Sequence, residues 1–165
     1  PPSGGFFLCR KNSYLPEVTP KHPKPMPAET IAIEAIVHAP VEKVYSLYTQ
    51  PQHITQWNFA DESWCCPRAS NDLRLGGKYL ARMEAIDGTL GFDFEGIYLQ
   101  VIHEEVLHFE MPDQRQVWVR FEPINESPKG VKVSLNFHPH PDQPEEVQAN
   151  GWNAILNRFK HYVEN

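Results

Sequence analysis

The stretch Asp142–Asn165, DQPEEVQANGWNAILNRFKHYVEN, carries the longest helical pattern in the chain. Its apolar residues fall three, four, seven, ten and eleven positions after the first one, which places them on one face of an α-helix. They are Trp152, Ile155, Leu156, Phe159, Tyr162 and Val163. The opposite side is polar, so we expect the rest of the chain to supply a sheet that covers the apolar face.

Several residues of this stretch lead to local expectations. Asp142 and Glu145 have the spacing of a helix-capping pair, and Pro144 suits the first turn, where its missing N–H costs nothing. Gly151 lies in mid-helix, where glycine is less favourable than alanine by about 1 kcal/mol. We therefore expect a close approach or an open space beside it, with a merely tolerated glycine as the alternative. Trp152 is the expected anchor of the helix in the core.

The remaining chain predicts one strand, two short helices and six further strands. Within residues 30–38, apolar side chains recur at every second position, Ile31, Ile33, Ala35 and Val37, which is the period of a half-buried strand. Pro40 and Pro51 then open two short helical patterns. Turn residues separate the later strands, and Asp87-Gly88 is a strong hairpin signal. The predicted spans are 63–68, 77–86, 90–102, 105–111, 115–123 and 130–138.

Alternation within these strands assigns one set of side chains to the inner face of the sheet. This set comprises Tyr79, Ala81, Met83, Phe92, Phe94, Tyr98, Leu107, Phe109, Val117, Val119, Phe121, Val131, Val133 and Leu135. Ile97, Leu99, Val101 and Trp118 break the alternation. We therefore expect a bulge in the long strand 90–102 or a second contact surface.

The composition fits one globular domain with an N-terminal extension. Of the 165 residues, 41% are hydrophobic and 22% are charged. Residues 1–28 contain seven of the sixteen prolines, which predicts a flexible extension followed by a folded domain over 29–165. Outside the extension, 11 basic and 20 acidic residues give a net charge of −9. An acidic domain repels phosphate backbones, which argues against nucleic acid as a partner.

Cysteine usage and hydropathy predict the compartment. Cys9, Cys65 and Cys66 form no disulfide framework, which favours a reducing cytoplasm. No apolar run approaches the roughly 20 residues that a membrane-spanning helix needs. The sequence also lacks a phosphate loop and a dinucleotide fingerprint. We therefore expect a cytoplasmic protein without cofactor or membrane span, present as a monomer or a weak dimer.

The predicted order of elements resembles the helix-grip fold of the START-like, or SRPBCC, superfamily. Short sequence words resemble the branch that is similar to the activator of the heat-shock-protein-90 ATPase. They are HAPVEKV at 38–44, Trp57, DLRLGG at 72–77, Asp87-Gly88, FEGIY at 94–98 and Gly151-Trp152. The resemblance covers about residues 29–163. It implies an α+β fold in which a curved antiparallel sheet grips the last helix around a hydrophobic cavity.

This implied cavity makes the aromatic residues candidates for the wall of a ligand site, because such sites are concave and mostly apolar. The candidate ligand-binding residues are Trp57, Phe92, Phe94, Tyr98, Phe109, Gly151, Trp152, Ile155, Leu156 and Phe159. The alternative is that the same residues fill a solid core.

The loop before the last helix contains residue types suited to Zn²⁺ or Ni²⁺, namely His138, His140, Asp142 and Glu145. An exposed histidine loop is far commoner than a metal site, and we predict no metal site. Cys65 and Cys66 are strand neighbours that point to opposite faces and cannot readily chelate together. We expect both thiols to be inert.

The charged residues Glu84, Asp93 and Glu95, with Arg74 and Arg82, have the types needed for acid–base chemistry. Cross-strand ion pairs on the outer face of the sheet explain them more simply. No catalytic residue is therefore assigned.

Three functions remain open. The leading interpretation is a non-enzymatic protein that holds a small hydrophobic or amphipathic ligand, such as a lipid, in the cavity. An enzyme of cyclase or hydrolase type, as among other START-like relatives, requires a polar group inside the cavity, with Tyr98, Glu95 and His108 as candidates. A co-chaperone-like domain requires an exposed surface for a chaperone or another protein partner, although the eukaryotic activators that it resembles carry an additional domain.

Overall fold

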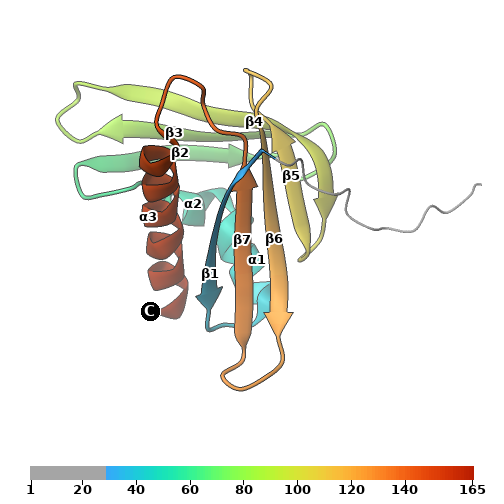
Figure 1. The fold of residues 1–165 in the computed structure, drawn as a ribbon. Coiled ribbons are helices and arrows are strands. Elements are labelled where there is room, and N and C mark those ends of the chain that lie inside the picture. Colours follow the sequence, from blue (N-terminus) through green and yellow to red (C-terminus); the bar gives the residue numbers. More distant parts are fainter. Residues whose placement is uncertain (1–28) are drawn as a thin grey trace, which may run out of the picture.

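Residues 29–165 are described by a computed structural model, and they form a seven-stranded antiparallel sheet with three helices (Figure 1). In chain order the elements are β1 (Ile31–Val37), α1 (Val41–Thr49), α2 (Pro51–Trp57), β2 (Trp64–Asn71), β3 (Lys78–Ala85), β4 (Gly91–Ile102), β5 (Val106–Glu110), β6 (Gln116–Ile124), β7 (Gly130–Phe137) and α3 (Glu145–Glu164). The predicted α+β class and element order are confirmed. The predicted flexible extension, residues 1–28, lies outside the described residues and stays a prediction.

The sheet is a meander whose first strand joins its far edge, in the order β1-β7-β6-β5-β4-β3-β2. β1 pairs with β7 so that Ile31 lies opposite Phe137, which brings the start of the domain beside the segment that leads into α3. The sheet curves, and α3 lies on its concave side (Figure 1). This arrangement is the helix grip expected from the sequence.

The expected irregularities of the sheet are present. The pairing of β4 with β5 shifts between Tyr98 and Gln100. As a result, the next side chain after Tyr98 to face inward is that of Val101, three residues on instead of two. This bulge explains why alternation fails in the long strand. Trp118 is only 5% exposed although it lies on the outer face, because its ring is stacked against His108 at 4.6 Å between centroids. His138 contacts the same indole edge-on at 5.2 Å, so the outer face has a contact surface of its own.

The beginning of α3 differs from the sequence prediction. The helix starts at Glu145 with Pro144 as its N-cap residue, and no side chain caps it. Asp142 instead donates its backbone N–H to Nδ1 of His140 at 3.2 Å, so the capping prediction is wrong. Gln148 ties down the preceding loop: its Nε2 donates to the carbonyl oxygens of His140 and Gln143, and its Oε1 accepts from the His140 N–H. A buried side chain one turn into the helix therefore fixes the loop.

The buried anchor of α3 is Phe159 rather than Trp152. Phe159 has no exposed surface and packs edge-on against Trp57 at 4.9 Å and Tyr48 at 5.1 Å. Trp152 is half-buried and stacks on Phe137 of β7 at 4.4 Å. Its other side borders open space, because a cavity lies between the helix and the sheet. Within residues 29–165, no helix combines the length and apolar character needed to cross a membrane.

Candidate functional site

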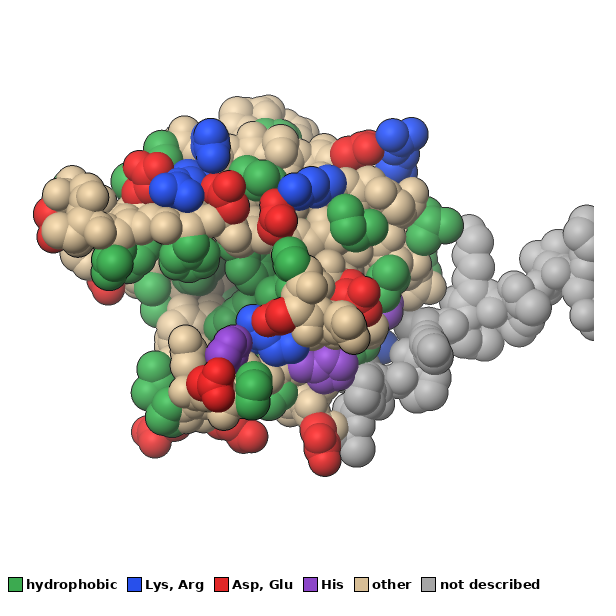
Figure 2. Space-filling model, turned by 90° about the horizontal axis from the view of Figure 1, so that it is seen from above, with side chains coloured by type: hydrophobic (Ala, Val, Ile, Leu, Met, Phe, Trp, Pro, Cys, Tyr) green, Lys and Arg blue, Asp and Glu red, His purple; other side chains and the backbone are tan. Residues whose placement is uncertain are grey.

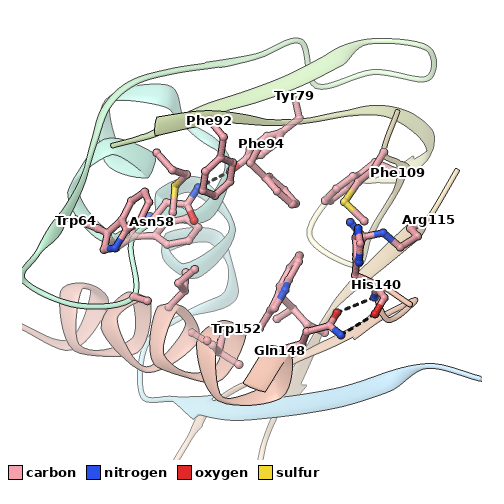
Figure 3. Close-up of a pocket in the computed structure, with 18 of the residues that line it drawn as sticks. Asn58, Trp64, Tyr79, Phe92, Phe94, Phe109, Arg115, His140, Gln148 and Trp152 are labelled. Atoms are coloured by element: carbon pink, nitrogen blue, oxygen red, sulfur yellow. Dashed lines mark hydrogen bonds between the residues drawn. The ribbon is translucent and has the colours of Figure 1, made fainter. Parts of the chain in front are cut away.

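A cavity of about 420 Å³ lies between the concave face of the sheet and α3. From above, the surface is hollowed beside the protruding sheet, and hydrophobic side chains line the hollow (Figure 2). Figure 3 shows rings from β3, β4 and β5 facing Trp152 of α3 across the opening. The lining residues are Tyr48, Trp57, Asn58, Ala60, Trp64, Tyr79, Met83, Phe92, Phe94, Tyr98, Leu107, Phe109, Met111, Arg115, Leu135, His140, Gln143, Val147, Gln148, Gly151, Trp152, Ile155 and Leu156.

The structure brings nine of the ten predicted ligand-site residues together around this cavity. They are Trp57, Phe92, Phe94, Tyr98, Phe109, Gly151, Trp152, Ile155 and Leu156. Phe92 is 50% exposed and lies at the rim. Phe159 does not line the cavity, because its ring is buried behind Trp57 and Tyr48.

The cavity stays open where α3 stands away from the middle of the sheet. The helix makes its most extensive strand contact with β1, at the edge of the sheet. A Cβ atom added at Gly151 would meet nothing within 4 Å outside its own helix. The expected open space beside this glycine is therefore confirmed. Trp152 borders the space, held by its stacking on Phe137 and by an edge contact with Phe94 at 5.5 Å.

Tyrosine hydroxyls supply polar groups in the inner wall. The hydroxyl of Tyr98 donates to Oδ1 of Asn71 at 2.9 Å, and that of Tyr79 accepts from Nδ2 of Asn58 at 3.1 Å. Burial raises the pKa of Tyr48, Tyr79 and Tyr98 above the ordinary value of a phenol. These hydroxyls therefore remain protonated and neutral at physiological pH.

One end of the cavity is polar and carries a positive charge. Arg115, His140, Gln143 and Gln148 gather there, and Figure 3 shows three of them on the same side of the opening. Nε of Arg115 donates to the Asp113 carboxylate at 2.7 Å. Burial disfavours the ionised Asp113, yet the hydrogen bonds and charge of Arg115 hold the pKa of its carboxyl below the usual value.

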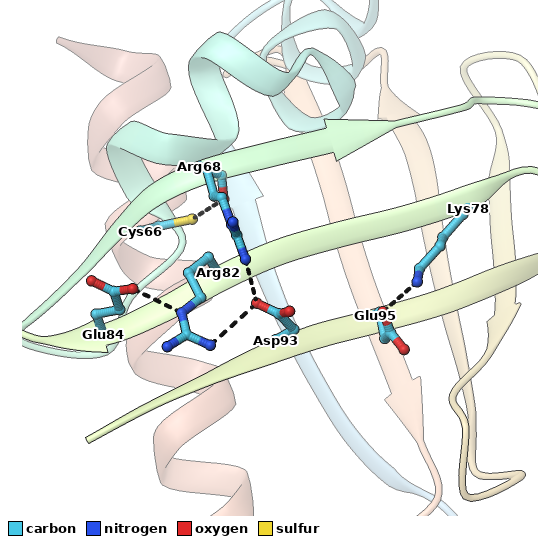
Figure 4. A network of polar contacts seen from close by, with 7 residues as sticks. All are labelled: Cys66, Arg68, Lys78, Arg82, Glu84, Asp93 and Glu95. Atoms are coloured by element: carbon cyan, nitrogen blue, oxygen red, sulfur yellow. Dashed lines mark hydrogen bonds and ion pairs between the residues drawn. The ribbon is translucent and has the colours of Figure 1, made fainter.

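Four of the five charged residues considered for acid–base chemistry lie on the outer face of the sheet (Figure 4), whereas Arg74 pairs with Asp72 in the connection from β2 to β3. Nε of Arg82 is 2.8 Å from Glu84, and its Nη1 is 3.4 Å from Asp93. Glu95 pairs with Lys78 on the same face. The cross-strand interpretation is therefore confirmed for the pairs Arg82–Asp93 and Lys78–Glu95, whereas Arg82 and Glu84 pair within β3.

Of the three residues named for an enzyme, only Tyr98 lines the cavity. Glu95 is on the outer face, and His108 stacks there on Trp118. The enzyme interpretation thus has one of its three polar candidates inside the cavity.

The histidine loop does not gather its side chains at one point. His138 contacts Trp118 on the outer face, whereas His140 lines the cavity. In the described part of the chain, no group of three or more His, Cys, Asp or Glu side chains could hold a metal ion. Burial raises the pKa of Cys66 to about 11, so its thiol stays protonated at neutral pH, as expected for an inert cysteine.

The polar end was missed in the sequence, although two signals point to it. Arg115 lies two residues before Val117, and strand alternation therefore continues the inner face to Arg115. Gln148 lies four residues before Trp152, on the apolar side of the helix. Both signals were weak because charged and amide residues are usually exposed.

Comparison with known proteins agrees with this geometry. The family described as Activator of Hsp90 ATPase homolog 1-like protein matches residues 38–164. The AHSA1-like protein of Aeromonas hydrophila, solved in solution, is 36% identical with a TM-score of 0.75, over 82% of this chain and 92% of that one. The solution structure of Chr148 from Cytophaga hutchinsonii is 38% identical with a TM-score of 0.70, over the same shares of 82% and 92%.

A third structure, protein NE0264 of Nitrosomonas europaea, shares the fold at 21% identity and a TM-score of 0.72, over 85% of this chain and 97% of that one. No protein of curated function matches the chain. The match to the family covers most of the folded domain, including the strands and the helix that enclose the cavity. The chain therefore belongs to the Activator of Hsp90 ATPase homolog 1-like family.

Proposed function

We propose that this protein is a non-enzymatic binding protein that encloses a small hydrophobic or amphipathic molecule between the sheet and α3. The observation that carries the proposal is the open cavity of about 420 Å³ beside Gly151. Its volume lies within the roughly 300–1,000 Å³ that is typical of small-molecule sites. Most of the wall is aromatic or aliphatic, with a few polar groups at one end.

The apolar wall supports useful affinity without an ion pair. Burial of apolar surface contributes about 25 cal/mol per Å², so about 250 Å² of ligand surface corresponds to about 6 kcal/mol. Part of this gain is offset by the lost freedom of the ligand. The protonated tyrosines orient a ligand by hydrogen bonding but add no charge to the wall.

The test is a titration with decanol, a neutral apolar probe, followed by amide chemical shifts. Shifts should change in Phe92–Tyr98 and Gly151–Leu156. Gly151→Leu should weaken decanol binding about tenfold, because a side chain that excludes about 60 Å² of buried ligand surface removes about 1.5 kcal/mol. Asn150→Leu adds the same side chain on the exposed face of α3 and should leave the affinity unchanged.

The alternative of a protein-binding domain has its own observation. Ile86, Leu90 and Phe92 are exposed around the hairpin that joins β3 to β4. Decanol shifts confined to residues 86–90 of this hairpin, which do not line the cavity, or binding that is indifferent to Gly151→Leu, would contradict the cavity and favour a protein partner.

A further inference from the structure

We propose that the ligand is an amphipathic monocarboxylate whose acid group pairs with Arg115 while its apolar part extends toward Trp64 and Met83. This inference rests on the proposed function, because it concerns the same cavity. It adds the chemical class of the ligand and its direction in the site.

The position of Arg115 supports an anionic head group. Its side chain is 23% exposed and lines the cavity. The turn from β5 to β6 fixes its backbone, since the Met111 N–H donates to the Arg115 carbonyl at 2.8 Å and Gln114 adopts a φ of 68°. Nε is used by Asp113, but within residues 29–165 the Nη atoms have no hydrogen-bond acceptor. A guanidinium with unused donors is suited to bind a carboxylate in bidentate fashion.

His140 and Gln148 complete the polar end. Nδ1 of His140 accepts the Asp142 N–H, so Nε2 carries the proton in the neutral ring and is a donor. The side-chain amide of Gln148 is hydrogen-bonded to the backbone of His140 and Gln143, which holds the loop in place beside Arg115. The polar end is thus preorganised before a ligand arrives.

The surrounding charge favours a single negative charge on the ligand. Asp113 already neutralises part of Arg115, and Asp142, Glu145 and Glu146 are exposed on the adjoining loop and first turn of α3. A dianion such as a phosphate monoester would meet more repulsion there than a carboxylate. The chemistry therefore points to a monocarboxylate.

Figure 3 shows Trp64 and Phe92 on the side of the cavity away from Arg115, and Met83 is the strand partner of Phe92, so this end receives the apolar part of the ligand and limits its size. Trp64 and Phe92 lie edge-on at 6.0 Å, and Met83 lines the wall beside them. A water molecule occupies roughly 30 Å³ of the liquid, so a cavity of about 420 Å³ has room for about 14 non-hydrogen atoms of that size. Decanoate, with a ten-carbon chain, is a suitable probe.

The experiment compares decanoate with decanol by isothermal titration calorimetry at pH 7.5, on the full chain. Arg115→Gln should lower the decanoate-to-decanol affinity ratio by about 10- to 100-fold, as expected for losing charge-assisted hydrogen bonds to the carboxylate. Arg74→Gln is the matched control. Like Arg115, Arg74 donates from Nε to an aspartate two residues before it, here Asp72 at 2.9 Å, but Arg74 does not line the cavity. It should change neither affinity.

Two further measurements sharpen the result. Asp113→Asn should strengthen decanoate binding about threefold by removing a competing carboxylate. Nuclear Overhauser contacts should join the ligand methyl group to Met83 and its α-methylene to Gln148. Decyl phosphate should bind more weakly than decanoate, and tighter phosphate binding would overturn the carboxylate assignment.

Failure of this inference is distinguishable from failure of the proposed function. If decanol binds in the cavity but Arg115→Gln leaves the decanoate-to-decanol affinity ratio unchanged, the monocarboxylate proposal is wrong and the binding function stands. If neither probe binds, both proposals are wrong. Circular dichroism of each variant checks that the fold is retained.

Discussion

Phe159→Ala is expected to lower the free energy of unfolding by about 3–5 kcal/mol. The ring has no exposed surface and joins α3 to α1 and α2 through Tyr48 and Trp57, so its removal leaves a hole in the core. A single domain is stable by about 5–15 kcal/mol, and this loss is a large share of it. Urea denaturation monitored by circular dichroism measures the change.

Trp152→Ala is the informative comparison. Trp152 is larger, but part of its surface already borders the cavity, so its truncation should cost less than that of Phe159. Lys160→Ala, beside Phe159 on the helix, is the mild control. A Trp152→Ala loss greater than that of Phe159→Ala would show that the indole, and not Phe159, anchors the helix.

Gly77→Ala is expected to lower the free energy of unfolding by about 2–3 kcal/mol, toward the upper end of overpacking effects. A Cβ atom here would overlap the carbonyl oxygen of Asp72, which belongs to the backbone and cannot rotate away. The carbonyl of Gly77 also accepts the Tyr98 N–H at 3.0 Å, so a displaced loop would disturb β4 beside the cavity. Thermal and urea unfolding should both register the loss.

Gly151→Ala is the control, because it is expected to raise the free energy of unfolding. Its new Cβ meets nothing within 4 Å, and alanine is favoured over glycine in a helix by about 1 kcal/mol. The variant should therefore unfold at a higher urea concentration than the unaltered protein. If Gly77→Ala and Gly151→Ala changed the free energy of unfolding equally, the contrast between the crowded surroundings of Gly77 and the open space beside Gly151 would be wrong.

Local patterns were enough to predict the elements of this fold. The period of the apolar residues identified α3 and the strands, since one-sided burial imposes a spacing of 3.6 or 2 residues on the sequence. Asp87-Gly88 located a hairpin, with Gly88 at a φ of 74°, because that backbone conformation suits glycine. Even the bulge in β4 was visible as a break in alternation around Leu99.

The site was only partly visible in the same patterns. Aromatic residues on the inner faces of the strands and α3 were assigned correctly to one side of the sheet, but their spacing is the same in a filled core and in a cavity wall. Whether rings meet or leave space depends on the distance of α3 from the middle strands. That distance is decided by contacts such as Phe137 with Trp152, between residues far apart in the chain.

Only the tertiary structure determined how deeply each side chain is buried and which polar side chains meet at one end of the cavity. Phe159 and Trp152 share one helical face, yet only Phe159 is enclosed, because α1 and α2 cover its part of the helix. Arg115, His140 and Gln148 converge because the β5–β6 turn and the loop before α3 lie at the same end of the curved sheet. Periodicity determines which face a side chain takes, whereas packing between distant segments determines what that face encloses.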